Sequence, residues 1–120
     1  IELYSFDSMP LNQLLMRCSM MITDYSSACW DVYYQGKPVL FYQFDVDDYN
    51  RTNGSYLNME NDLFGDRCTE QEDLVHLIKD YAENGFQEKQ KYAEMRKEYF
   101  AYIDHNNCQR TYEYIKSQGY

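Results

Sequence analysis

The sequence Met20-Met-Ile-Thr-Asp-Tyr-Ser-Ser27 passes from a compact apolar run into a polar turn. The apolar run indicates a short buried strand, because it stops abruptly where the polar residues begin. Residues 26–35 then have the composition of a helix that ends at Gly36, with Pro38 just beyond it. The stretch therefore predicts a strand, a tight turn and a helix, in that order.

The segments on either side extend this pattern. Val39–Tyr42 is apolar at every position, as in a parallel strand that helices cover on both faces. Upstream, Ile1–Tyr4 suits a short strand, and residues 10–17 suit an amphipathic helix with a proline in its first turn. These elements alternate as β-α-β-α-β. The sequence thus predicts an α/β fold with a parallel sheet and flanking helices.

The C-terminal part, about 69–118, is predicted to be helical. Before it, residues 43–67 lose any regular pattern and are expected to form a long connection with turns at Asn53-Gly54 and Phe64-Gly65. Thr69-Glu-Gln-Glu72 fits a capping box at the start of a helix. Two further amphipathic helices are expected over 88–103 and 107–117.

Composition and charge exclude several functions. A chain of 120 residues makes about one ordinary domain. Its formal net charge of −9 repels polyanions, so we expect no nucleic acid as a partner. The cysteines are widely separated and form no Cys-x-x-Cys pair, so no zinc or redox motif is indicated. Scattered, reduced cysteines are typical of a cytoplasmic protein. The sequence has neither an apolar run long enough to span a membrane nor a signal-peptide pattern.

Ser26 and Ser27 are candidates for binding a diphosphate. A strand that opens through a tight turn into a helix presents unpaired backbone amides and the positive end of the helix dipole. The two serine side chains are small enough to leave those amides accessible, and each adds a hydroxyl donor. Capping preference alone favours the simpler alternative that the serines only cap the helix.

The runs Ile22–Ser27, Trp30-Asp31 and Lys37–Asp45, followed by Asp48-Tyr49, form a specific pattern. They resemble the CDP-glycerol glycerophosphotransferases, the bacterial teichoic acid primases and polymerases. The resemblance implies the Rossmann-like, C-terminal half of a two-domain GT-B transferase. Residues 1–120 would then be a single donor-nucleotide-binding domain within a longer enzyme.

The resemblance also assigns roles to residues of this chain. The implied ligand is CDP-glycerol or a related nucleotide donor, and the implied donor-binding residues are Thr23, Asp24, Tyr25, Ser26, Ser27 and Asp31. Ser26 and Ser27 would hold the diphosphate, and Asp31 would lie near the ribose. Thr23 and Asp24 would shape the end of the strand.

No catalytic residue is expected in this chain, nor a metal or cofactor. The family's catalytic histidines lie upstream of the turn, where this sequence has none, while His76 and His105 match neither of them. We therefore expect this piece alone to be inactive. The missing N-terminal domain would bind a lipid-linked polymer acceptor, and the full-length protein would lie at the inner face of the cell membrane.

Several alternatives stay open. Where the family usually has Arg-Gly-aromatic, this sequence has Asn53-Gly-Ser-Tyr56, so the donor could instead be CDP-ribitol or a nucleotide sugar for a capsular or surface polysaccharide. Asp45-Val-Asp47 is a D-x-D of the kind that binds a divalent metal in other transferases. A calcium loop is rejected, because Asn50 and Tyr56 replace its required Gly and Glu. A nucleotide-binding or assembly module without chemistry is the non-enzyme alternative.

Overall fold

The computed structural model describes residues 2–5, 7–55 and 57–120. Within these ranges a three-stranded parallel sheet has the order β1-β2-β3, with bounds β1 Met21–Thr23, β2 Val39–Tyr42 and β3 Asp66–Cys68. Thr23 is in register with Phe41, and Phe41 with Arg67. Because all three strands are parallel, their carboxyl ends meet at one edge of the sheet. The predicted α/β class and parallel sheet are confirmed.

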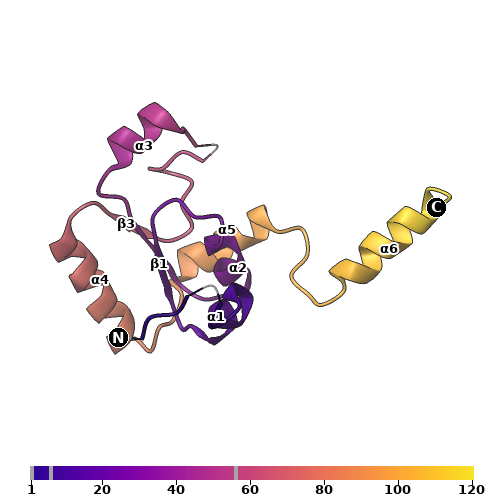
Figure 1. The fold of residues 1–120 in the computed structure, drawn as a ribbon, viewed down its shortest axis with the longest axis horizontal. Helices are drawn as coiled ribbons and strands as arrows, with labels where there is room; N and C mark the ends of the chain where they lie inside the picture. The colour runs from indigo at the N-terminus through magenta and orange to yellow at the C-terminus, as the bar shows by residue number, and fades with distance from the viewer. Residues whose placement is uncertain (1, 6, 56) are drawn as a thin grey trace.

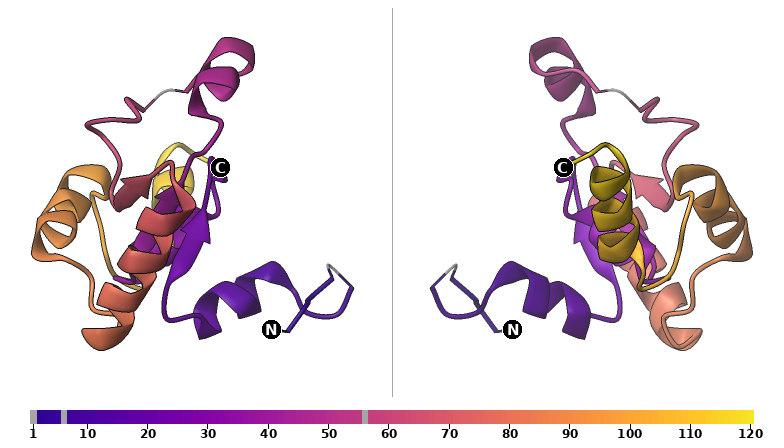
Figure 2. Two further views of the ribbon diagram at one scale, coloured as in Figure 1. Left: turned by 90° about the vertical axis from the view of Figure 1, so that its left-hand side faces the viewer. Right: turned by 90° about the vertical axis from the view of Figure 1, so that its right-hand side faces the viewer.

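Helices surround the sheet and extend beyond it (Figure 1). Their bounds are α1 Leu11–Arg17, α2 Cys29–Tyr34, α3 Val46–Thr52, α4 Gln71–Glu83, α5 Gln90–Tyr99 and α6 Asn107–Ser117. The α3 helix protrudes from the rest, and the chain returns from it to β3 (Figures 1 and 2). No helix in the described ranges combines the length and apolarity that a membrane crossing requires.

Two sequence-based expectations about elements before β2 are wrong. Residues 2–4 form no strand, since these exposed residues pair with no neighbouring strand; Ile1 lies outside the described residues. The helix expected from Ser26 begins only at Cys29, and its N-cap position is held by Ala28. Residues 26–28 form a turn instead, with the amides of Cys29 and Trp30 bonded to the carbonyls of Ser26 and Ser27 at 3.3 and 3.1 Å.

The expected long connection over 43–67 contains two elements that the sequence pattern did not reveal. One is α3, whose first turn carries Asp47 and Asp48 and whose last turn carries Arg51, an arrangement that suits the helix dipole. The other is β3, which is too short and too polar to show a strand pattern. The capping box is also wrong, because Glu70 holds the N-cap of α4 without a side-chain hydrogen bond.

The core lies between the sheet, α2 and α5, and it is rich in aromatic rings. Tyr33 is fully buried, its ring stacks on Phe64 at 4.2 Å between centroids, and its hydroxyl donates to the Tyr92 carbonyl at 2.6 Å. Gly65 allows β3 to approach β2, because a Cβ atom there would lie 2.0 Å from the Val39 carbonyl oxygen. This packing fixes the strand ends that carry the polar turn.

A second polar cluster joins β3 to α4 and α5. The Asp66 carboxylate accepts hydrogen bonds from the hydroxyls of Tyr81 and Tyr92 at 2.9 and 2.7 Å and from the Lys89 ammonium. Burial alone would raise the pKa of Asp66, but the hydrogen bonds from Lys89 and the tyrosines outweigh it and lower that pKa. The carboxylate is therefore charged and fully engaged at neutral pH.

The α6 helix is attached to the rest through few contacts. Every residue of α6 except Arg110 is exposed, and the helix lies apart from the sheet (Figure 1). The Tyr34 hydroxyl donates to the Asp104 carbonyl at 2.8 Å, and Arg110 pairs with the Asp104 carboxylate at 2.8 Å. The first bond holds the connection that leads into α6, and the second joins the first turn of α6 to that connection.

Candidate functional site

A hollow of about 330 Å³ lies at the carboxyl ends of the strands. One wall is the turn after β1, and another is the segment that returns from α3, represented by Ser55, Leu57 and Met59. The base is largely apolar and includes Trp30, Phe41 and Phe64. Concave sites with an apolar lining and a few convergent polar groups are typical of ligand pockets, and in open α/β sheets they occur at this edge.

The turn directs polar groups toward this hollow. Ser26 Oγ accepts a bond from the Ala28 amide at 3.3 Å, which leaves its hydroxyl hydrogen free to donate elsewhere. Among the described residues, no acceptor pairs with the backbone amides of Ser26 and Ser27 or with the Ser27 hydroxyl. The turn therefore presents several unpaired donors beside one another. Since Ala28 holds the N-cap position of α2, helix capping does not account for both serines.

Tyr25 connects the turn to α3. Its hydroxyl donates to Asp45 Oδ1 at 3.0 Å, and its ring stacks on Tyr49 at 3.6 Å with an interplanar angle of 6°. Burial, together with the bond to Asp45, raises the pKa of the Tyr25 phenol. The phenol thus stays protonated and acts as a hydrogen-bond donor. The contact therefore ties the turn, which is one wall of the hollow, to the start of α3.

The predicted site residues do not all line the same hollow. Asp24, Tyr25, Ser26 and Ser27 line the strand-end hollow together. Thr23 is a half-buried residue of β1 and does not line it. Asp31 is exposed and lines a separate hollow of about 490 Å³ beside Tyr34 and Phe100. Trp30 lines both hollows and therefore lies between them.

Gln43 belongs to the site although the sequence did not single it out. It directly follows β2, lines the hollow and is fully buried. Its Nε2 donates to the Asp24 carbonyl at 3.2 Å, and its Oε1 accepts from Arg67 Nε at 2.8 Å. The available signal was an amide side chain at the end of an entirely apolar strand, a position that commonly carries a functional group in parallel sheets.

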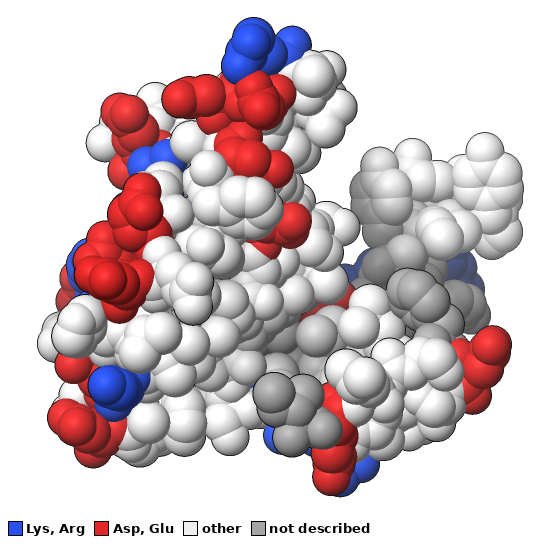
Figure 3. Space-filling view, turned by 60° about the vertical axis from the view of Figure 1, so that its left-hand side comes forward, with Lys and Arg blue, Asp and Glu red and all other residues white. Residues whose placement is uncertain are grey.

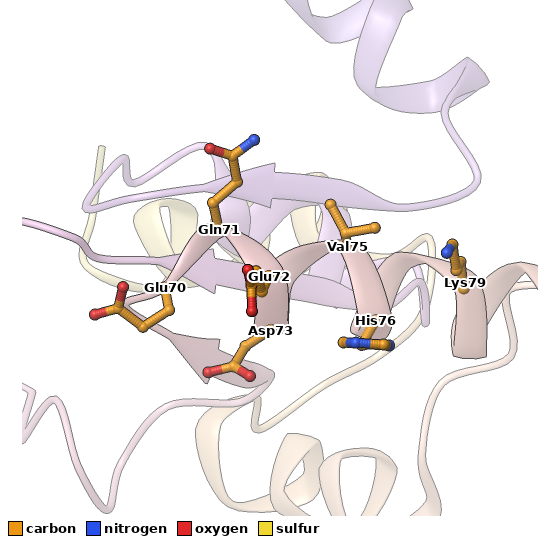
Figure 4. Close-up of a pocket in the computed structure, with 7 residues that line it drawn as sticks. All are labelled: Glu70, Gln71, Glu72, Asp73, Val75, His76 and Lys79. Atoms are coloured by element: carbon orange, nitrogen blue, oxygen red, sulfur yellow. The ribbon is translucent and has the colours of Figure 1, made fainter.

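A larger hollow, of about 800 Å³, lies on the surface of α4. Figure 4 shows that its lining side chains come from α4 and the residue before it, and that they project from the helix without converging on one point. His76 is among them, while His105 is exposed in the connection before α6. Neither histidine lies in the strand-end hollow. This surface has the character of a solvated helix face.

The carboxylates near the strand-end hollow form no evident metal centre. Asp45 accepts the bond from Tyr25, and Asp47 lines a neighbouring hollow rather than this one. In residues 2–5, 7–55 and 57–120, no cluster of three or more His, Cys, Asp or Glu side chains is placed to hold an ion. Acidic side chains nevertheless gather around α3, at the top of the view in Figure 3.

Cys29 also lines the hollow, but its thiol is not activated. The residue is buried, and burial raises its pKa to about 11. A thiol with that pKa is almost entirely protonated at neutral pH, and the thiolate is the nucleophilic form. Cys29 therefore serves as part of the apolar wall.

Comparison with known proteins identifies relatives of this chain. It is 34% identical over 104 residues to the minor teichoic acid biosynthesis protein GgaB of Bacillus subtilis, covering 86% of this chain and 11% of that protein. It is 33% identical over 78 residues to the teichoic acid poly(ribitol-phosphate) polymerase of Bacillus spizizenii, covering 64% and 13%. It is 35% identical over 72 residues to the teichoic acid glycerol-phosphate primase of the same species, covering 60% and 19%.

The chain thus spans less than a fifth of the length of each of these relatives. A family model described as CDP-glycerol:poly(glycerophosphate) glycerophosphotransferase matches residues 3–117, which is nearly the whole chain. The matched region includes the turn, the strand-end hollow and all three strands. This chain belongs to the CDP-glycerol:poly(glycerophosphate) glycerophosphotransferase family.

Proposed function

We propose that this chain is the donor-binding domain of a transferase that moves glycerol phosphate from CDP-glycerol to a teichoic-acid-like polymer. Membership of the family supports the reaction class, and the open donors of the turn support the role of the domain. The domain would be the C-terminal half of a GT-B enzyme. Thr23, Asp24, Tyr25, Ser26, Ser27 and Asp31 are the proposed donor-binding residues.

The observation that carries the proposal is the set of unpaired donors at the turn. Ser26 and Ser27 line a hollow of about 330 Å³, and among the described residues no acceptor pairs with their backbone amides or with their hydroxyl hydrogens. Phosphate oxygens are strong acceptors and suit a group of converging N–H and O–H donors. In a chain of net charge −9, such a local set of donors is what an anionic ligand requires.

The same donors would assist the reaction. An acceptor hydroxyl attacks the phosphorus that carries glycerol, the bond from that phosphorus to the oxygen of CMP breaks, and CMP leaves with the resulting negative charge. Hydrogen bonds directed at the leaving phosphate stabilise this charge as it develops. The general base would come from the N-terminal domain, so we propose that this chain alone binds the donor without transferring it.

The nucleoside would extend past Trp30. A diphosphate at Ser26 and Ser27 occupies the first hollow, and Trp30 separates this hollow from the one that Asp31 lines. The Asp31 carboxylate would then accept hydrogen bonds from the ribose hydroxyls. Contact at Asp31 thus requires the ligand to span both hollows.

A second candidate donor is CDP-ribitol. One of the two relatives from Bacillus spizizenii is a poly(ribitol-phosphate) polymerase, and Asn53 replaces the arginine usual in the family. Ribitol phosphate is longer than glycerol phosphate by two hydroxylated carbons. The same diphosphate contacts would serve both donors, so discrimination would depend on groups outside the turn.

The partners and location of the whole protein are also proposals. The acceptor would be a lipid-linked polymer bound by the N-terminal domain. Such an acceptor would place the full-length enzyme on the cytoplasmic face of the membrane. This chain would contribute nucleotide binding and no membrane contact of its own.

Calorimetric titration tests the proposal. The protein is titrated with CDP-glycerol, CDP-ribitol, CDP, UDP and GDP, first in chelator and then with Mg²⁺ or Mn²⁺. We expect cytidine-selective binding in chelator. Binding only with metal would support the Asp45-Val-Asp47 alternative, and no binding of any nucleotide would favour an assembly module.

A further inference from the structure

Gln43 is the polar side chain that the structure buries completely within the described part of the chain, with an exposure of 0%. Buried amides are costly unless their donors and acceptors are paired. The Gln43 backbone amide donates to the Cys68 carbonyl at 2.9 Å, which continues the β2–β3 ladder. The backbone of Gln43 is therefore fixed by β3, and its side chain is free to reach sideways toward β1.

Arg67 determines which way the Gln43 amide faces. A guanidinium nitrogen can only donate, so the atom of Gln43 that lies 2.8 Å from Arg67 Nε must be the oxygen. The nitrogen of the same amide must then point the other way. There it meets the carbonyl oxygen of Asp24 at 3.2 Å and the sulfur of Met59 at 3.4 Å. The assignment of oxygen and nitrogen thus follows from chemistry.

This one side chain connects two walls of the strand-end hollow to β3. Asp24 begins the turn after β1, Met59 lies on the segment returning from α3, and Arg67 belongs to β3. Among the described residues, no other donor pairs with the Asp24 carbonyl. The peptide that leads into the open amides of the turn is therefore held from outside the turn by Gln43.

We infer that Gln43 is a positioning residue, which Arg67 locks in one orientation so that it holds the Asp24 carbonyl and aims the Ser26 and Ser27 amides into the hollow. The consequence for nucleotide affinity rests on the proposed function. The positioning itself does not, because it is a property of the free protein. The two parts can therefore fail separately.

The first experiment uses the isotope-labelled protein without ligand. Gln43→Met keeps the length of the side chain and removes both of its hydrogen bonds, whereas Arg67→Met removes only the hydrogen bond donated to Gln43 Oε1. We expect both variants to shift or broaden the amide signals of residues 25–28, and Arg67→Lys to restore them because lysine also donates. The amides around Tyr81 and Lys89 should stay unchanged in all three variants.

Gln35→Met is the matched control. Gln35 also donates from Nε2 to a backbone carbonyl, that of Asp31 at 3.0 Å, but it is exposed. Its substitution should leave residues 25–28 unaffected. Unchanged turn signals in Gln43→Met and Arg67→Met would overturn the inference. Equal changes of the turn signals in Arg67→Lys and Arg67→Met would also overturn it, because the orientation of Gln43 would then not depend on a hydrogen bond donated by residue 67.

The second experiment measures the affinity for CDP. Loss of one buried hydrogen bond that orders a binding loop corresponds to about a tenfold change in affinity. We expect Gln43→Met to weaken CDP binding by about that factor and Gln35→Met to change it less than twofold. If the wild-type protein binds no CDP, the proposed function fails while the ligand-free shifts still test the positioning. If Gln43→Met shifts the amide signals of residues 25–28 but leaves the affinity for CDP unchanged, Gln43 positions the turn without contributing to nucleotide binding.

Discussion

Two polar clusters lie on the same small sheet, and they differ in how many of their groups have partners. In the Asp66 cluster, the carboxylate accepts bonds from two tyrosine hydroxyls and a lysine, and all of these groups come from the chain itself. In the turn cluster, Gln43 is paired at both ends, while the amides of Ser26 and Ser27 find no partner in the described residues.

The difference distinguishes a structural cluster from the cluster that we propose binds a ligand. A buried polar network whose members satisfy one another contributes to stability and orientation of the fold. A group of donors that is held rigidly but left open contributes little to folding and is available to a ligand. Substitutions in the first cluster should therefore change stability alone, and substitutions of Ser26 and Ser27 should change binding with little effect on stability.

The largest effect is expected for Asp66→Asn. The variant lacks the negative charge to which the Lys89 ammonium and the two tyrosine hydroxyls donate hydrogen bonds in a largely buried position. We expect this loss to lower the free energy of unfolding by about 2–4 kcal/mol. Urea denaturation of the variant and the wild type at neutral pH measures this difference in the free energy of unfolding. Asp80→Asn, on an exposed position of α4, is the control and should change stability by less than about 0.5 kcal/mol. A similar loss in both variants would show that the cluster has no special role.

The same cluster predicts how stability depends on pH. Because the pKa of Asp66 is lower in the folded protein than in the unfolded chain, the unfolded state binds the proton more readily. The stability that this carboxylate contributes is present above its unfolded pKa of about 3.9 and is lost as the pH falls through its folded pKa. Between pH 2 and 7 the free energy of unfolding, measured by urea denaturation at each pH, should therefore change less for Asp66→Asn than for the wild type.

The next largest effect is expected on ligand affinity, when the two serines of the turn are replaced. Replacing Ser26 and Ser27 together by Ala removes two hydroxyl donors to a charged ligand, and we expect the affinity for CDP-glycerol to fall about tenfold or more. Stability should change little, because only the weak bond from the Ala28 amide is lost. Ser19→Ala, at an exposed position after α1, provides the control. A large loss of stability in the double variant would mean that the serines serve the fold.

The smallest effect is expected at Asp31. An exposed carboxylate that contacts the ribose contributes roughly one modest hydrogen bond, so Asp31→Asn should weaken CDP-glycerol binding about two- to fivefold. Comparing the affinities for CDP-glycerol and inorganic pyrophosphate locates the effect, because pyrophosphate lacks a ribose. An equal loss for both ligands would be evidence against a ribose contact.

The sequence predicted the elements that carry strong apolar patterns. Val39–Tyr42 and the run before the turn are strands, and the three C-terminal helices occur close to their expected bounds. The sequence missed β3, because Asp66–Cys68 takes its place in the sheet through pairing with β2 and the close approach at Gly65, not through its own composition. It placed the start of α2 too early, since a turn and a helix N-terminus have the same residue preferences.

The sequence grouped candidate site residues correctly in space where neighbours in sequence are neighbours in the fold. Asp24–Ser27 line one hollow because they form a single turn. Asp31 faces a different hollow, because a helix residue several positions further along points to another side of α2. Gln43 was missed because its role depends on Arg67, a residue 24 positions away that no local pattern connects to it.

The most direct test of the central claim is an NMR titration of the isotope-labelled protein with CDP-glycerol in chelator. The signals to follow are the backbone amides of residues 25–28, with those around Asp66 as an internal reference. The account predicts saturable shifts at the turn, strongest at Ser26 and Ser27, and none around Asp66. Saturable binding that shifts residues elsewhere and leaves the turn unchanged would contradict it.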